Sequence, residues 1–121
     1  MLPSTKRSAT TTEIGQPAKD GNVPARERLP NRRACETIAF EHGGAAFTMT
    51  AGRYPDGRIG EIFINAAHAN SALDALASDA AIALSFALQH GADLAAVKAA
   101  MKRNSAGEAS SPIGAALDLV L

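Results

Sequence analysis

Apolar and polar residues alternate along the chain after its first third. Ile38 and Phe40 are separated by one small residue, and Phe47 and Met49 repeat this two-residue spacing. Such a period is typical of strands that bury one face. The run over residues 59–64 is more continuously apolar, so it predicts a third strand that is covered on one face and partly shielded on the other.

Glycine-containing turns separate these three runs. Gly43-Gly44 lies between the first two, and the sequence Tyr-Pro-Asp-Gly-Arg over residues 54–58 lies between the second and third. Proline presets φ and glycine accepts a positive φ, so both segments are typical of tight turns and predict an antiparallel meander. Gly52 and Gly60 flank the second turn and indicate a bulge or a close crossing.

After Asn65 the apolar spacing changes to three and four residues, which predicts a helix of about five turns. Asn70 or Ser71 is its expected N-cap and Gly91 its expected C-terminal glycine. Ile82 and Phe86 lie off the main apolar stripe, so we expect that flank to meet another helix or a partner subunit. The stripe itself comprises Leu73, Leu76, Ala80, Ala83, Leu84, Ala87 and Leu88.

Two shorter helices are expected to follow. Asp93 can cap the first, with Leu94, Val97 and Met101 facing inward and Lys98, Lys102 and Arg103 in its last turn. Ser111 and Pro112 are suited to the N-cap and first helical position of the second, which runs to the chain end. The predicted fold class is α+β, a three-stranded antiparallel meander followed by three helices packed on one sheet face.

Charge is divided unevenly along the 121 residues. The chain carries 12 Lys plus Arg and 12 Asp plus Glu, yet residues 1–33 hold seven basic and three acidic side chains, a balance of +4. That segment also contains four prolines and few large apolar residues, so it buries too little surface to offset the entropy of ordering. We therefore expect a disordered basic N-terminal tail and lead-in over residues 1–33 and a folded domain over residues 34–121.

Composition also limits the cellular setting. Polar residues interrupt the most apolar window, residues 73–88, so we expect no membrane span. The N-terminus lacks the apolar region of a secretory signal, and a single cysteine suits a reducing compartment. The expected location is the cytoplasm.

Few residues suggest chemistry. Cys35 has no second cysteine to pair with, and the three histidines are too scattered to complete a zinc site, so we expect no metal and interpret Cys35 as a small buried filler. No nucleophile motif is present, so we expect no catalytic residue. Glu61 interrupts an apolar strand, and is either solvated, paired with Arg53 or Arg58, or part of a site.

Basic side chains suggest anion binding only weakly. Lys98, Lys102 and Arg103 could hold a phosphate, although such a group is more often a solvated helix end. The arginines of the tail have no interleaved aromatic residues, so nucleic acid is an unlikely partner. His90 is expected to interact with a helix C-terminus.

Three stretches together resemble the TSCPD domain. They are Arg26-Glu27-Arg28-Leu29-Pro30, the run from Tyr54 to Ile64, and the run from Ser85 to Leu94. This domain occurs near the C-terminus of adenosylcobalamin-dependent (class II) ribonucleotide reductases and in short independent proteins. The resemblance covers about residues 26–121. Where the short members carry Thr-Ser-Cys-Pro-Asp, this chain has Ser110-Ser111-Pro112-Ile113, so any thiol or metal role of that motif does not carry over.

The resemblance implies an accessory or binding module of ribonucleotide reduction, with a reductase subunit or a second copy as partner and no catalytic set of its own. One alternative is part of a split cobalamin-dependent ribonucleoside-diphosphate reductase that supports deoxyribonucleotide synthesis. Another is a small nucleotide- or nucleic-acid-binding dimer. Adenosylcobalamin is implied by the resemblance only, and we expect this chain to bind no cofactor. The candidate ligand or partner contacts are Tyr54, Asp56, Arg58, Glu61, Gln89, Lys98, Lys102 and Arg103.

Overall fold

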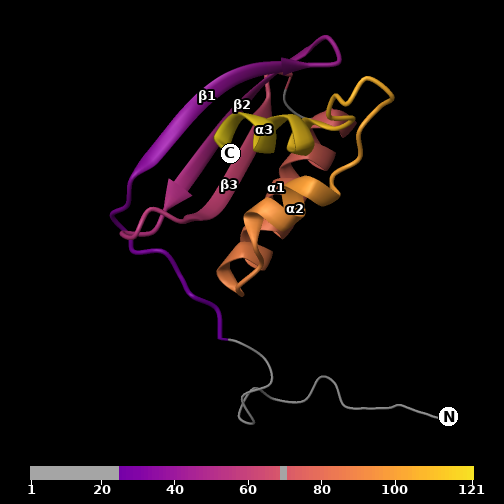
Figure 1. The fold of residues 1–121 in the computed structure, drawn as a ribbon. Helices are drawn as coiled ribbons and strands as arrows, with labels where there is room; N and C mark the ends of the chain where they lie inside the picture. The colour runs from indigo at the N-terminus through magenta and orange to yellow at the C-terminus, as the bar shows by residue number, and fades with distance from the viewer. Residues whose placement is uncertain (1–24, 69–70) are drawn as a thin grey trace, which may run out of the picture.

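The computed structural model describes residues 25–68 and 71–121 and confirms the expected α+β class (Figure 1). Its three strands form one antiparallel sheet in chain order, and three helices follow them. The part of the predicted tail over residues 1–24 lies outside the described residues. The elements are β1 Cys35–His42, β2 Ala45–Arg53, β3 Ile59–Ala66, α1 Ala72–Gln89, α2 Leu94–Ala100 and α3 Pro112–Val120.

The turn and cap predictions are confirmed. Gly43 and Gly44 have φ of 60° and 81° between β1 and β2, and Gly57 has φ of 96° between β2 and β3. These left-handed conformations favour glycine, because a Cβ atom would clash with the backbone. Gly91 at φ 100° follows α1. The N-caps are Ser71, Asp93 and Ser111, whose side chains each accept a hydrogen bond from a backbone N–H of the first turn.

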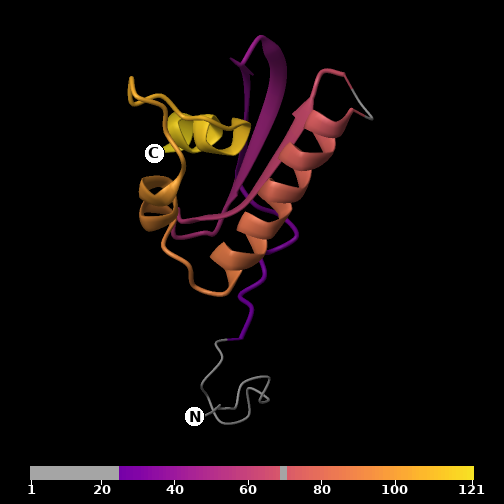
Figure 2. The same cartoon turned by 90° about the vertical axis from the view of Figure 1, so that its right-hand side faces the viewer.

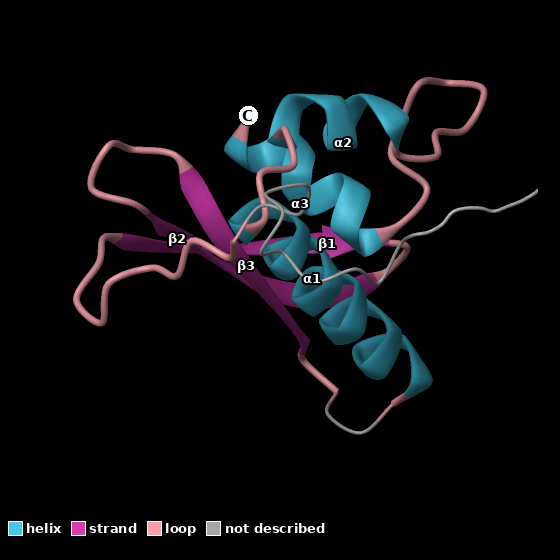
Figure 3. Cartoon of the chain, turned by 90° about the horizontal axis from the view of Figure 1, so that it is seen from below, coloured by secondary structure: helices cyan, strands magenta, loops and turns pink. Residues whose placement is uncertain are grey.

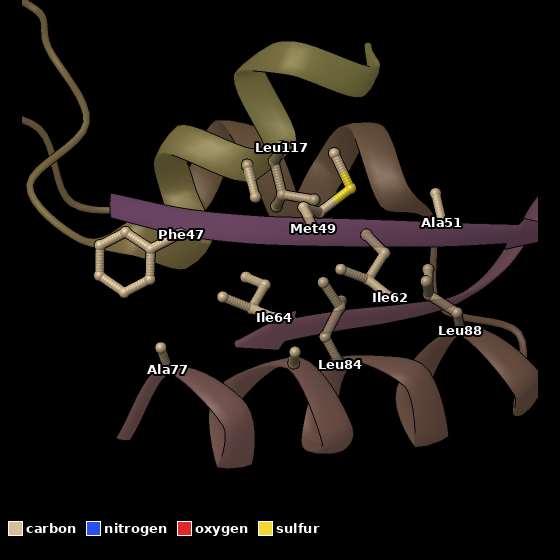
Figure 4. Close-up of a cluster of buried hydrophobic side chains, with 11 residues drawn as sticks. Phe47, Met49, Ala51, Ile62, Ile64, Ala77, Leu84, Leu88 and Leu117 are labelled. Atoms are coloured by element: carbon tan, nitrogen blue, oxygen red, sulfur yellow. The ribbon is translucent and has the colours of Figure 1, made fainter. Parts of the chain in front are cut away.

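Strand register decides which sheet face is buried. Met49 lies opposite Ile38 on β1 and opposite Ile64 on β3, so these three residues point to the same face. That face forms the core together with small and branched residues of α1 and α3 (Figure 4). The buried core comprises Phe47, Met49, Ala51, Ile62, Ile64, Ala77, Ala81, Leu84, Leu88, Ala116 and Leu117.

The three helices lie on this face, and α1 and α3 contact different strands. α3 packs on β1 and β2, α2 lies beside α3, and α1 runs along β3 (Figures 2 and 3). Ala116 and Leu117 of α3 are fully buried, as their spacing predicts. Leu94, Val97 and Met101 are half-buried against the core, although α2 ends at Ala100, so the prediction that Lys102 and Arg103 lie in its last turn is wrong.

The predicted apolar stripe of α1 is wrong in part, because the helix covers the outer edge of β3 with polar side chains. Ser85 Oγ accepts from the backbone N–H of Ile62 at 2.8 Å, and Ser78 Oγ donates to the carbonyl of Ile64 at 2.9 Å. This contact turns the helix so that Ser85 is buried, while Leu76 is 70% exposed.

Two more α1 side chains complete this edge. Asp74 Oδ1 accepts from the N–H of Ala66 at 2.8 Å, and Gln89 Nε2 donates to the carbonyl of Gly60 at 3.0 Å. Of the described helices, only α1 is long and apolar enough to cross a membrane by length and composition. Ala77, Ala81, Leu84 and Leu88 of this helix are buried in the core, whereas Leu76, Ile82 and Phe86 are exposed.

Candidate functional site

Residues 25–34, called the lead-in from here on, run along one end of the sheet and contact the end of α1 and the β2–β3 turn (Figure 1). The N–H of Glu27 donates to the carbonyl of Gln89 at 2.7 Å, and the carbonyl of Glu27 accepts from the Tyr54 hydroxyl. The lead-in residues of the predicted tail are therefore attached to the domain by specific backbone contacts.

The turn between β2 and β3 holds the side chain of Glu27. Arg58 Nη2 donates to both carboxylate oxygens of Glu27 at 3.1 and 3.2 Å, and Arg58 Nε donates to Asp56 Oδ2 at 2.7 Å. The guanidinium also lies 4.5 Å from the centre of the Tyr54 ring. Hydrogen bonds to Glu27 and then Asp56 raise the pKa of Arg58, and hydrogen bonds from Arg58 lower the pKa of Asp56. Burial raises the pKa of the Tyr54 phenol, which stays protonated and able to donate.

Glu61 pairs with the lead-in rather than with the residues expected from the sequence. Its carboxylate accepts from Nε and Nη2 of Arg33, and the hydrogen bond to Glu61 raises the pKa of Arg33. The predictions of a solvated Glu61 or of pairing with Arg53 or Arg58 are wrong, since Glu61 is only 6% exposed. Its side chain occupies the space that a Cβ on Gly52 would need, which confirms the close crossing expected there.

Gln89 joins the lead-in to both α1 and β3. Its Oε1 accepts from Arg26 Nε at 2.6 Å, while its Nε2 donates to Gly60 on the strand edge. The guanidinium of Arg26 lies 4.4 Å from the centre of the Phe86 ring, within the range of a cation–π contact. Five of the eight candidate residues thus gather around the lead-in. We call this set the clamp, and it comprises Tyr54, Asp56, Arg58, Glu61 and Gln89.

The other three candidates lie away from the clamp. Arg103 donates to both carboxylate oxygens of Asp118 at 2.6 and 3.0 Å, and Lys98 Nζ lies 3.9 Å from the same carboxylate. The hydrogen bonds from Arg103 lower the pKa of Asp118. Lys102 is exposed beyond the end of α2. Two of these three cations are therefore engaged with an acidic side chain, which does not favour an anion site.

Cys35 is exposed, so its interpretation as a buried filler is wrong. It lies on the sheet face that no helix covers, in one row with Gly52 and Glu61 across the three strands. The prediction for His90 agrees with the structure, since its Nδ1 lies 2.9 Å from the carbonyl of Phe86 at the end of α1.

The described residues do not fit the corrinoid cofactor that the resemblance implies. One cavity, of about 770 Å³, opens between the β1–β2 hairpin and the loop over residues 104–110. A second, of about 420 Å³, lies between the β2–β3 turn and the start of α2. Ligand pockets enclose most of a ligand's surface, and neither cavity is large and closed enough for a group larger than drug-sized molecules. His42 lines the larger one, but its Nε2 lies 3.0 Å from the carbonyl of Ala109.

Sequence reasoning missed the partners that the clamp binds. Glu27 and Arg33 belong to a segment whose composition indicates disorder, and they meet residues 27 and 28 positions further along the chain. The spacing of residues within a short segment cannot predict contacts between residues so far apart in the sequence. The available signal was the co-occurrence of Arg26–Pro30 with the Tyr54–Ile64 run in the resemblance.

The fold and the clamp define a small α+β domain that binds its own lead-in. The TSCPD domain family matches residues 18–121, and the chain belongs to that family. Its domain is related to vitamin B12-dependent ribonucleotide reductases. The reductase of Agrobacterium fabrum is 44% identical over 69 residues, which are 57% of this chain and 5% of that protein. Those of Streptantibioticus cattleyicolor and Streptomyces coelicolor are 41% identical over 71 residues, 59% of this chain and 12% or 7% of theirs. The chain thus corresponds to a small part of these proteins, and no solved structure matches it.

Proposed function

We propose that this chain is a non-catalytic accessory module of ribonucleotide reduction that acts in the cytoplasm by binding a B12-dependent reductase. The observation that carries the proposal is the use of the clamp. Tyr54, Arg58 and Glu61 of the clamp each hydrogen-bond through their side chains to the lead-in. In the related reductases the matching segment is 5–12% of the protein, so there it adjoins a much longer polypeptide.

An exposed apolar surface offers the contact for such a partner. Phe63 lies between the core-facing residues Ile62 and Ile64 and therefore points to the uncovered face, where it is 43% exposed. Ile82 and Phe86 lie one helical turn apart on α1 and are 45% and 48% exposed. Ser78 and Ser85 bind the strand on either side of Phe63, so the α1 segment containing Ile82 passes Phe63. Apolar surface of this kind marks interaction sites.

The test combines the purified chain with a B12-dependent reductase from which the matching segment has been deleted. We expect binding by calorimetry and a change in the rate of ribonucleotide reduction. Ile82→Glu should weaken binding at least about tenfold, because it buries a charge in an apolar contact. Leu76→Glu is the matched control, since Leu76 is exposed on another face of α1. Absence of both binding and any change in turnover would overturn the proposal.

Exposure of Cys35 favours a second candidate, in which the chain supplies one part of a split reductase. A redox role predicts that Cys35→Ser abolishes turnover of the combined proteins. The accessory role predicts unchanged turnover, because an exposed cysteine replaced by serine alters stability little. Turnover of the native chain and the Cys35→Ser variant in parallel therefore separates the candidates.

A further inference from the structure

The two edge strands of the sheet differ in whether their outward backbone groups have hydrogen-bond partners. On β3 the outward backbone groups of Gly60, Ile62, Ile64 and Ala66 bind side chains of α1. β1 is the other edge strand, and in Figure 1 no described element runs along its outer side. An edge strand presents a row of unpaired N–H and C=O groups that can pair with another strand.

The register identifies which β1 groups point outward. Arg53 donates its N–H to the carbonyl of Ala34, and antiparallel pairing then directs the backbone groups of every second residue, from 34 to 42, at β2. The groups of Cys35, Thr37, Ala39 and Glu41 therefore point away from the sheet. Among the described residues none of these backbone groups has a hydrogen-bond partner. β1 contains no lysine, proline or bulge, and its charged residues are Glu36 and Glu41.

We propose that β1 pairs antiparallel with β1 of a second copy of this chain, with the two-fold axis at Ala39. This register places Glu36 of each copy, whose carboxylate accepts from Arg53 of its own chain at 2.8 Å, opposite His42 of the other. A carboxylate therefore faces an imidazole ring at two places in the dimer. The register also places Ile38 opposite Phe40 of the second copy. Both are half-buried in the single chain, and the pairing covers their remaining apolar surface.

Neighbouring registers lack this complementarity. An axis at Ile38 sets Glu36 against Phe40, and an axis at Phe40 sets Ile38 against His42. With the axis at Ala39, the outward groups of Ala39 meet each other, and those of Thr37 meet those of Glu41, as antiparallel ladder pairing requires. The product is a continuous sheet whose two outer edges are both covered by α1.

The first test measures mass in solution for the full chain. Sedimentation velocity should give a concentration-dependent dimer of twice the 12.4 kDa chain mass. Ala39→Lys sets two lysines against each other at the axis, so the dimer dissociation constant should rise at least about tenfold. Thr48→Lys is the matched control, because Thr48 lies beside Ala39 on the same exposed face but on the central strand. A chain that remains monomeric at all concentrations, or a dimer that both variants weaken equally, would overturn the proposal.

The second test addresses the register. His42→Glu places two glutamates opposite one another in its own homodimer and should be mainly monomeric. Glu36→Lys replaces the carboxylate that faces His42 and should dimerise more weakly than the native chain. In a mixture, the lysine introduced in one copy faces the glutamate introduced in the other, and the second contact keeps the native Glu36 against the native His42. The mixture should therefore form a heterodimer. Failure of the mixture to associate more strongly than either variant alone would exclude this register.

Discussion

Glu61 depends on the glycine at position 52, because its side chain occupies the space that a Cβ atom there would need. The carboxylate is buried on the sheet face that no helix covers, and its cost is offset by the two hydrogen bonds from Arg33. A side chain at position 52 would displace Glu61 and separate this pair. Glycine in the middle of a strand is otherwise unfavourable, so this contact explains its presence.

This dependence predicts a non-additive pair of substitutions. Gly52→Ala should lower the free energy of unfolding by about 1–3 kcal/mol in the native background, as overpacking does. In a Glu61→Ala background the same change should cost less than about 0.5 kcal/mol, because the clash is gone. Urea denaturation of the four proteins measures the difference.

Gly60→Ala is the control for this cycle, because a Cβ there would lie 2.5 Å from the Tyr54 ring. Its cost should therefore be the same in both backgrounds. If Gly52→Ala lowers the free energy of unfolding equally in the native and Glu61→Ala backgrounds, the proposed dependence of Glu61 on Gly52 is wrong.

α1 stabilises the sheet through its polar side chains as well as its apolar ones. Ser85 alone serves both the N–H and the carbonyl of Ile62 while it also lies 2.9 Å from the carbonyl of Ala81. A buried N–H without a partner is costly. The helix therefore holds β3 by hydrogen bonds that a purely apolar helix could not make.

Ser85→Ala should consequently destabilise the domain by about 1–3 kcal/mol, because it leaves the buried N–H of Ile62 unsatisfied. Ser78→Ala removes a donor from a part-buried carbonyl contact and should cost less than about 1 kcal/mol. Amide hydrogen exchange should accelerate at Ile62 in the first variant only. Equal exchange at Ile62 in both variants would show that α1 does not protect this edge through Ser85.

α3 and the loop before it are linked through Asp118, which predicts a small pH dependence. Its pKa is lowered by Arg103, so the pair stabilises the fold above the ordinary aspartate pKa of about 3.9 and loses that effect as pH falls through the folded value. Because Asp118 is 35% exposed, solvent screening limits the effect to on the order of 0.5 kcal/mol.

Asp118→Asn should therefore reduce the free energy of unfolding at neutral pH and make little difference at pH values below the folded pKa of Asp118. Thermal unfolding at several pH values measures the difference. Asp79→Asn is a suitable control, since Asp79 is exposed on α1 and belongs to no salt bridge of the described residues. A constant difference between the native chain and Asp118→Asn across this range would contradict the assignment.

At the scale of the whole molecule, local signals predicted the elements but not the contacts between distant segments. Gly57, Gly91 and Ser111 each act within a few residues, so their spacing was sufficient to predict turns and caps. The buried face of α1 was misjudged because it includes Ser85, whose polarity is satisfied only by a strand edge. The ion pair of Glu61 could not be predicted from local spacing either, because its partner, Arg33, lies 28 positions earlier in a segment of polar composition. The resemblance identified the clamp residues, whereas their common target required the fold.

The clamp joins the lead-in to the body of the domain, in part through the Tyr54 hydroxyl. Tyr54→Phe removes the hydroxyl that donates to Glu27 and leaves the ring in place, so it should lower the free energy of unfolding by no more than about 1 kcal/mol. It should nevertheless accelerate tryptic cleavage after Arg28, since a protease requires a released backbone and local release precedes global unfolding. Cleavage after Lys102, which lies far from the clamp, provides the internal control. Unchanged cleavage after Arg28 in Tyr54→Phe would mean that the Glu27 carbonyl contact does not hold the lead-in, and the remaining clamp contacts through Arg33 and Arg58 would have to do so.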